Sequence, residues 1–334
     1  MKINETPVRT SINYGINNFE VPDDTFDIRP QNCVNQKPAI AQNEPLCKES
    51  KKQLSNPTEN RKIIFDKTNT NAQISYNLNK NNNILLCNTA LIAEENVDAN
   101  IVITLSSSAK AFASSFIGIN CKPNSKLNIT LLSNLKKSQN FVNIEANLAE
   151  NSVCNLNIID FCDTLTVIKQ TTNLSEDSAK FDINMLYLGT NNAQIDINII
   201  NNIFSTKSKA NINVVGALFD YASKNFKGTI DFKKGAVKSS GTENELCLLF
   251  SHNAKSKALP MLLAGEEDVD GSHSSATSKI DDKKLFYLMS RGLSKADSMK
   301  LYLKAQFNHI LSKLDKDVQK YVNNQIDRKL KDYE

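Results

Sequence analysis

The sequence predicts a mainly β protein with a parallel β-helix core and a C-terminal α-helical domain. Short runs of alternating apolar residues occupy the chain from about residue 82 to residue 250. Three of these runs repeat at a constant offset of 27 residues, and after residue 281 the apolar spacing becomes helical. We therefore divide the 334 residues into an irregular N-terminal segment (1–75), a β-helix core (76–280) and a helical domain (281–334).

The N-terminal segment is polar and holds most of the prolines of the chain. Its apolar residues form only short clusters, such as Phe19 with Val21 and Phe26 with Ile28. This composition indicates irregular structure that is loosely docked on the core.

The repeated runs predict strands that stack in coils. The repeated positions are Leu127, Ile129 and Leu131, then Cys154, Leu156 and Ile158, then Phe181, Ile183 and Met185. Small polar clusters precede each set, as turns before strands require. A β-sandwich is the competing interpretation, because alternating strands suit it equally well. The scarcity of glycine and proline between residues 82 and 215 disfavours the tight hairpins of a sandwich.

Three helices follow the strands. Asp281 or Asp282 caps the first helix, and Gly292 is suited to end it. Ser294 and Asp297 resemble a capping box that opens a second helix, which continues to about residue 313. A last helix spans about residues 317–331, with apolar residues along one face.

Composition narrows the cellular setting and the partners. A net charge of +4 shows no basic stripe for nucleic acid, and we expect no nucleic-acid partner. No apolar run reaches the roughly 18 residues of a membrane span, and no secretion signal is visible at the start, so we expect a cytoplasmic protein without a membrane partner. The seven cysteines are odd in number and include no CxxC pair, which favours reduced thiols in the core.

The common catalytic motifs are absent from the sequence. It contains no GxxxxGK[ST] phosphate loop, no GxGxxG turn, no HExxH pair and no GxSxG elbow. A carbohydrate-active β-helix enzyme remains an alternative, although the strand runs carry mostly asparagine and few acids in register. A structural β-helix module is a further alternative.

One segment resembles a known family. The run GEEDVDGSHSSATSKIDDKKLFYLMSRGLSKADSMKLYLKAQF, residues 265–307, is similar to the C-terminal signature of the SufB/SufD family of iron–sulfur cluster assembly proteins. The preceding segment 241–260 also resembles the last strands of that family. The resemblance implies a right-handed parallel β-helix core and a SufD-like, non-catalytic scaffold subunit.

The resemblance also implies partners and a cargo. A SufC-type ABC ATPase would hydrolyse ATP and bind the C-terminal helices, where Tyr302 and Phe307 are the expected contacts. A SufB-type subunit or a second copy would pair through the β-helix. An iron–sulfur cluster would be held transiently, either by this chain or shared with the partner.

His273 and Cys247 are the candidate cluster ligands. His273 matches the histidine of the family signature, and a neutral imidazole is a sound iron ligand near pH 7. Cys247 lies near the position of a cluster-building cysteine in SufB-type chains, and a thiolate binds iron well. The ordinary alternatives are a loop histidine bonded to neighbouring serines and a buried structural thiol. His252 is interpreted as a turn or surface histidine.

Two departures separate this chain from SufB-type sequences. Ser274 stands where they carry a glutamate after the histidine. Ala264 stands where some short homologues carry a cysteine. Both favour a SufD-like subunit or a short SufB/SufD-like protein.

Overall fold

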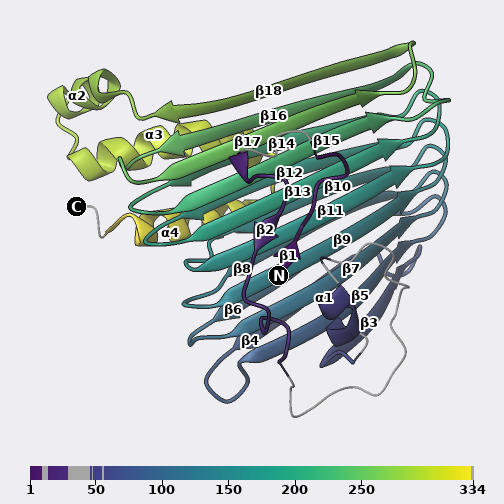
Figure 1. Ribbon diagram of the computed structural model, residues 1–334, viewed down its shortest axis with the longest axis horizontal. Coiled ribbons are helices and arrows are strands. Elements are labelled where there is room, and N and C mark those ends of the chain that lie inside the picture. The colour runs from purple at the N-terminus through teal and green to yellow at the C-terminus, as the bar shows by residue number, and fades with distance from the viewer. Residues whose placement is uncertain (10–13, 29–45, 47, 55, 332–334) are drawn as a thin grey trace.

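The computed structural model describes residues 1–9, 14–28, 46, 48–54 and 56–331. Its core is a parallel β-solenoid of about eight turns built from two eight-stranded sheets, as Figure 1 shows. One sheet contains β4 (Asn71–Leu78), β6 (Asp98–Ser107), β8 (Lys126–Asn134), β10 (Val153–Asp160), β12 (Lys180–Gly189), β14 (Lys209–Leu218), β16 (Ser239–Leu249) and β18 (Val269–Lys279). The other contains β3 (Glu59–Phe65), β5 (Ile84–Ala93), β7 (Phe112–Cys121), β9 (Gln139–Leu148), β11 (Leu165–Leu174), β13 (Gln194–Ile203), β15 (Ser223–Phe232) and β17 (Lys255–Ala264). The β-helix prediction is confirmed, and the first coil begins at Glu59.

The 27-residue offset is the sequence distance between residues that pair on neighbouring strands of the sheet. Cys154 on β10 pairs with Leu127 on β8 and with Phe181 on β12, and the other repeated positions pair in the same way. The turns before these strands contain Asn124, Asn151 and Ser178 with φ of 56°, 54° and 60°. Asparagine and other short polar residues tolerate this left-handed conformation, which reverses the chain between the two sheets.

Asparagine has a structural use on the outer face of the β4–β18 sheet. Asn71, Asn100, Asn128 and Asn155 occupy successive strands, and each of the last three donates its side-chain N–H to the side-chain oxygen of the asparagine before it, at 2.7–3.3 Å. An amide offers both a donor and an acceptor, so one residue type can extend such a ladder along the stack.

The N-terminal segment packs on the outer face of the β3–β17 sheet. Its regular elements are β1 (Lys2–Ile3), which pairs antiparallel with β2 (Phe19–Glu20), and α1 (Lys48–Leu54). Ile3, Val21 and Phe26 join an apolar cluster with residues of β5, β7, β9 and β11. The described residues of this segment therefore bury apolar surface against the solenoid.

A buried polar contact fastens the same segment to the sheet. The Lys227 ammonium group lies 2.6 Å from Asp196 Oδ1 and donates to the Asn4 carbonyl oxygen at 3.1 Å. The Asn4 amide in turn donates to Asp196 and to the Ile168 carbonyl oxygen. Neither side chain of the pair has exposed surface, so its charges are compensated by contacts within the protein and not by water.

The second and third C-terminal helices lie against the outer face of the β4–β18 sheet, and the first packs on the second near the end of the strands (Figure 1). In chain order these helices are α2 (Asp282–Ser290), α3 (Lys295–Leu311) and α4 (Lys316–Lys329). Asp281 caps α2, Gly292 follows it with φ of 94°, and Ser294 accepts from the Asp297 backbone N–H at the start of α3. The expected helix boundaries and caps are confirmed.

Among the described residues, no helix is both long and apolar enough to cross a membrane. The five described cysteines are buried free thiols, as expected for core residues. Cys33 and Cys47 lie outside the described residues.

Candidate functional site

The last coil, formed by β17 and β18, is the open end of the solenoid. β18 has β16 as its only neighbour in its sheet within the described chain, and almost all of its residues are exposed. An edge strand of this length exposes unpaired backbone groups that another chain can meet. This end is therefore a surface suited to contact with a protein.

His273 lies on the edge strand β18. The strand register places it on the side of β18 that faces the solenoid interior. Its register partner on β16 is Glu243, which lies on the inner side of that strand together with the buried Gly241 and Glu245. The next inward residue of β18, Ser275, donates to Glu245 Oε2 at 2.8 Å. His273 is nevertheless exposed, because no coil of the described chain covers it. The alternative interpretation of His273 as a loop histidine is wrong, since the residue is part of a strand.

Ser274 points to the other side of the sheet. Its hydroxyl donates to Asn244 Oδ1 at 3.0 Å, and Asn244 is an outward, exposed residue. The position at which this chain departs from SufB-type sequences thus does not share a face with His273.

Cys247 is fully buried on the inner side of β16. Its register partner is Thr277, four residues beyond His273, so the two candidate ligands are separated by about 13 Å along the strand direction. Burial raises the pKa of the Cys247 thiol, with Tyr187 and Ser256 beside it. The structure brings Cys247 and His273 to the same interior face without bringing them into contact.

Two glutamates and a lysine occupy the interior beneath the last coil. Lys224 on β15 lies 2.6 Å from Glu245 Oε1, and neither side chain has exposed surface. Glu245 Oε2 accepts from Ser275, so both of its oxygens are engaged. This is a satisfied buried ion pair.

Glu243 is different, because it has no such partner. Its side chain is completely buried, and neither carboxyl oxygen has a hydrogen-bond partner among the described residues. Burial, followed by the charge of Glu245, raises the pKa of Glu243 to about 8. Its carboxyl group lies against Gly228 on the opposite sheet, where an added Cβ would be 2.2 Å from Oε1.

Glu243, Glu245 and Lys224 were not singled out from the sequence. A usable signal was present, since Glu243 and Glu245 stand in phase with Cys247 in the strand run TENELC. The 30-residue spacing from Glu243 to His273 also falls near the coil repeat. Two acidic residues at inward-facing positions of a strand indicate a buried site where the negative charges must be compensated.

The described chain does not contain a complete metal site of its own. Among the described residues, no group of three or more His, Cys, Asp or Glu side chains is placed to hold a metal ion. Any cluster at the open coil would need ligands from another molecule or a rearrangement of this one.

The helices form a second candidate surface. Phe286, Tyr287 and Met289 of α2 are exposed, as are Leu293 and Leu301. Arg291 lies over the Tyr287 ring at 5.3 Å. We call these five exposed apolar residues the helical patch.

Tyr302 and Phe307 occupy different environments near the helical patch. Tyr302 is partly buried and packs beneath Lys284, whose ammonium group lies 5.9 Å from the ring centre. Phe307 is fully buried between α3 and the sheet. Phe307 therefore holds the helix in place, while the exposed surface belongs to the patch.

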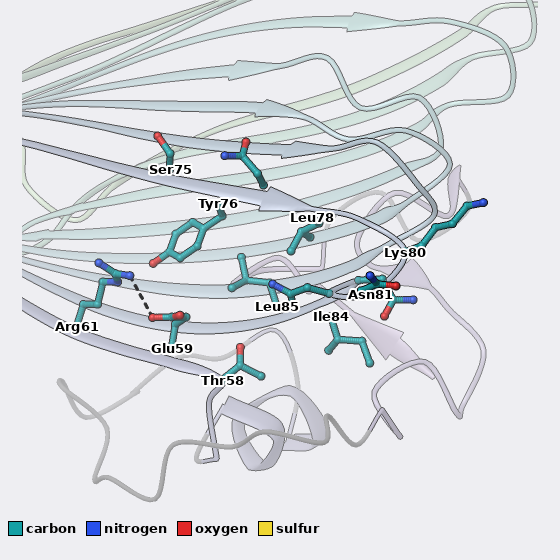
Figure 2. Close-up of a pocket in the computed structure, with 13 residues that line it drawn as sticks. Thr58, Glu59, Arg61, Ser75, Tyr76, Leu78, Lys80, Asn81, Ile84 and Leu85 are labelled. Carbon is teal, nitrogen blue, oxygen red and sulfur yellow. Dashed lines mark hydrogen bonds and ion pairs between the residues drawn. The ribbon is translucent and has the colours of Figure 1, made fainter.

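A polar cleft of about 750 Å³ lies at the first coil, at the opposite end of the solenoid (Figure 2). Arg61 pairs with Glu59 at 3.2 Å and lies over the Tyr76 ring at 5.6 Å. The Tyr76 hydroxyl is 3.2 Å from the sulfur of the buried Cys87, whose pKa is raised mainly by burial. This cleft is separate from His273 and from the helical patch.

A family model described as "SUF system FeS cluster assembly, SufBD core domain" matches residues 76–306. That match covers more than half of the chain, including the solenoid from the end of β4 onward, the open coil and much of α3. The chain belongs to the SufB/SufD family. It is a SufD-like member, as the sequence resemblance predicted.

Curated relatives support the SufD-like character. SufD of Bacillus subtilis is 29% identical over 167 residues, which are 50% of this chain and 38% of that protein. SufD of Escherichia coli is 32% identical over 80 residues, which are 24% of this chain and 19% of that protein. A SufBD family protein of Mycobacterium tuberculosis is 30% identical over 89 residues, 27% of this chain and 10% of that protein. The aligned regions thus span well under half of these SufB/SufD relatives.

Proposed function

We propose that this chain is a SufD-like, non-catalytic scaffold subunit of SUF iron–sulfur cluster assembly. It works with a SufC-type ATPase and with a SufB-type subunit or a second copy. The observation that carries the proposal is the open last coil, which presents His273 within a long unpaired edge strand inside the region that matches the family.

Pairing at the open coil would supply the metal ligands that the described residues lack. The described residues offer no complete metal site, whereas the end of a second solenoid would bring further ligands close to His273. His273 is the ligand available at the surface. Cys247 is a second ligand that a cluster reaches only after the last coil shifts, because the thiol is fully buried.

The helical patch is the docking surface for the ATPase. Its exposed aromatic side chains, Phe286 and Tyr287, suit anchoring contacts with a protein. Tyr302 borders this surface, and the buried Phe307 keeps α3 firmly on the sheet beneath it. A movement of the bound ATPase would therefore be transmitted to the strands under the helices.

Co-purification followed by anaerobic reconstitution tests the proposal. The full chain is expressed with a SufC-type ATPase, with and without a SufB-type subunit, and the complex is incubated with iron and sulfide. We expect a stable complex and visible cluster absorption that decreases in His273→Ala and Cys247→Ala. A chain that binds neither the ATPase nor a SufB-type subunit, nor itself, would overturn the scaffold assignment.

A further inference from the structure

The described residues 1–9 and 14–28 form a strap that crosses the outer face of the β3–β17 sheet (Figure 1). Its two arms are joined by the pairing of β1 with β2 and by hydrogen bonds between Thr6 and Asn17. Its tip, residues 14–17, reaches the last coil, where Lys257 of β17 donates to the Tyr14 carbonyl oxygen at 2.8 Å. The strap therefore connects the last coil to coils further down the stack.

The base of the strap is anchored by buried polar contacts. Asn4 is fully buried, and its side-chain amide donates to the Ile168 carbonyl oxygen on β11 at 3.1 Å. Lys227 of β15 donates to the Asn4 carbonyl oxygen at 3.1 Å. Asn198 of β13 donates to the Glu5 carbonyl oxygen at 2.9 Å. Breaking buried hydrogen bonds leaves polar groups unsatisfied, so we expect the base to stay in place.

The hydrogen bond at the tip is much easier to break. Tyr14 is 73% exposed, and the bond from Lys257 to its carbonyl oxygen lies at the surface. Water can replace either partner there, so the loss of this bond leaves no buried group unsatisfied.

Apolar burial adds to the attachment of the tip. Pro260 pairs with the inward-facing Gly228, so the next residue of β17, Met261, points outward. Met261 is nevertheless only 6% exposed, and Ile16 at the tip is 3% exposed. An outward side chain of the last coil is buried only by chain that lies outside the two sheets, and the strap crosses this face (Figure 1). The tip thus holds β17 through one surface hydrogen bond and a small apolar contact.

The contact at Lys257 adjoins the residues that cover Cys247. Ser256, the preceding residue, faces the interior and lies beside the Cys247 thiol. Its hydroxyl group is 3.1 Å from the Thr277 hydroxyl group on β18, and Thr277 is the register partner of Cys247. One hydroxyl from each sheet therefore closes the last coil over the thiol. A displacement of β17 at Ser256 would open this closure.

We propose that the tip of the strap is a latch that controls access to Cys247. While residues 14–17 lie on β17, Ser256 stays against Thr277 and the thiol is covered. When the tip leaves, β17 loses its connection to the anchored base and can move away from β18. The inference deepens the proposed function, on which it rests for the use of Cys247 as a ligand, whereas the latch itself is a property of the isolated chain.

Iodoacetamide labelling of the isolated full chain at pH 8, quantified for each cysteine by mass spectrometry, tests the latch. Lys257→Met removes the hydrogen bond to the tip, and Ile16→Ser weakens the apolar contact. Each variant is expected to raise the labelling rate of Cys247 about tenfold, because local opening of the last coil becomes more frequent. Lys255→Met replaces another exposed lysine of β17 and is expected to retain the wild-type rate.

Cys154 is the internal control, because it is fully buried on β10, far from the last coil. Its labelling should stay at the wild-type rate in all the variants, which separates local opening from global unfolding. Unchanged labelling of Cys247 in both Lys257→Met and Ile16→Ser would overturn the latch, as would an equal increase at Cys154. Failure of the proposed function is read separately, from the lack of any complex with the ATPase or a second subunit.

Discussion

The carboxyl group of Glu243 and the backbone of Gly228 meet across the interior of the solenoid. An ideal Cβ on Gly228 would lie 2.2 Å from Glu243 Oε1 and 2.5 Å from its carboxyl carbon. The two residues come from opposite sheets, on the consecutive strands β15 and β16, so the absence of a side chain at one position permits the burial of an acid at the other.

This contact predicts a coupled effect of substitutions. Gly228→Ala should lower the free energy of unfolding by about 1–3 kcal/mol, because the new methyl group overlaps the Glu243 carboxyl group. In a Glu243→Ala background the same change should cost much less. Urea unfolding of the four proteins measures the coupling, and purely additive effects would contradict the contact.

Glu243 also predicts a pH-dependent stability. Its pKa is about 8 in the folded chain against an ordinary value of 4.5, so the unfolded chain ionises first as the pH rises. The wild type should lose stability between about pH 4.5 and pH 8. Glu243→Gln should remove that loss and gain on the order of 3 kcal/mol at pH 7. Thermal unfolding at pH 5 and pH 8 measures the difference between the two proteins.

Glu245→Gln is the matched comparison, with the opposite expected sign. It leaves Lys224 buried without its charged partner and should destabilise the fold. Equal changes in stability of Glu243→Gln and Glu245→Gln would contradict the different environments assigned to the two glutamates.

The attachment of the N-terminal segment depends on the buried pair of Lys227 and Asp196. Lys227→Met should lower the free energy of unfolding by about 3–5 kcal/mol, because Asp196 would remain buried without a cation. Lys126→Met removes the exposed pair with Asp98 and should cost less than about 1 kcal/mol. Denaturant unfolding compares the two, and a similar small cost for both would refute the role assigned to the buried contact.

Substitutions at the helical patch and at the buried residues beneath it should affect ATPase binding and stability separately. Tyr287→Ser should weaken binding of a SufC-type ATPase while leaving the unfolding midpoint nearly unchanged, because the ring is exposed. Phe307→Ala should cost about 3–5 kcal/mol of stability, because its ring is fully buried. Calorimetric titration and thermal unfolding give the two readouts, and intact ATPase binding by Tyr287→Ser would place the docking surface elsewhere.

The Cys247 thiol should be unreactive in the isolated chain. It is fully buried and its pKa is raised by burial, so little thiolate forms near pH 8. Iodoacetamide labelling followed by mass spectrometry should show slow modification of Cys247, and faster modification when the ATPase partner is present with ATP. Rapid labelling of the isolated chain would contradict the buried position.

The coil repeat, the helix boundaries and the helix caps can be predicted from the sequence alone. These features depend on local signals: the spacing of Cys154 from Leu127 is the register, and the Ser294 cap bonds a residue three positions away. The family signature around His273 is similarly contiguous in the chain. Such patterns are visible without knowledge of what packs against what.

Contacts between side chains that are distant in the sequence become visible only in the folded protein. Asn4 contacts Asp196 although 192 residues separate them, and Phe307 is turned into the sheet while Tyr287 remains exposed. The place of Glu243 beside His273 required both the strand register and the knowledge that the stack ends at β18. Burial and charge compensation depend on the packing of distant coils, which no local pattern of residues specifies.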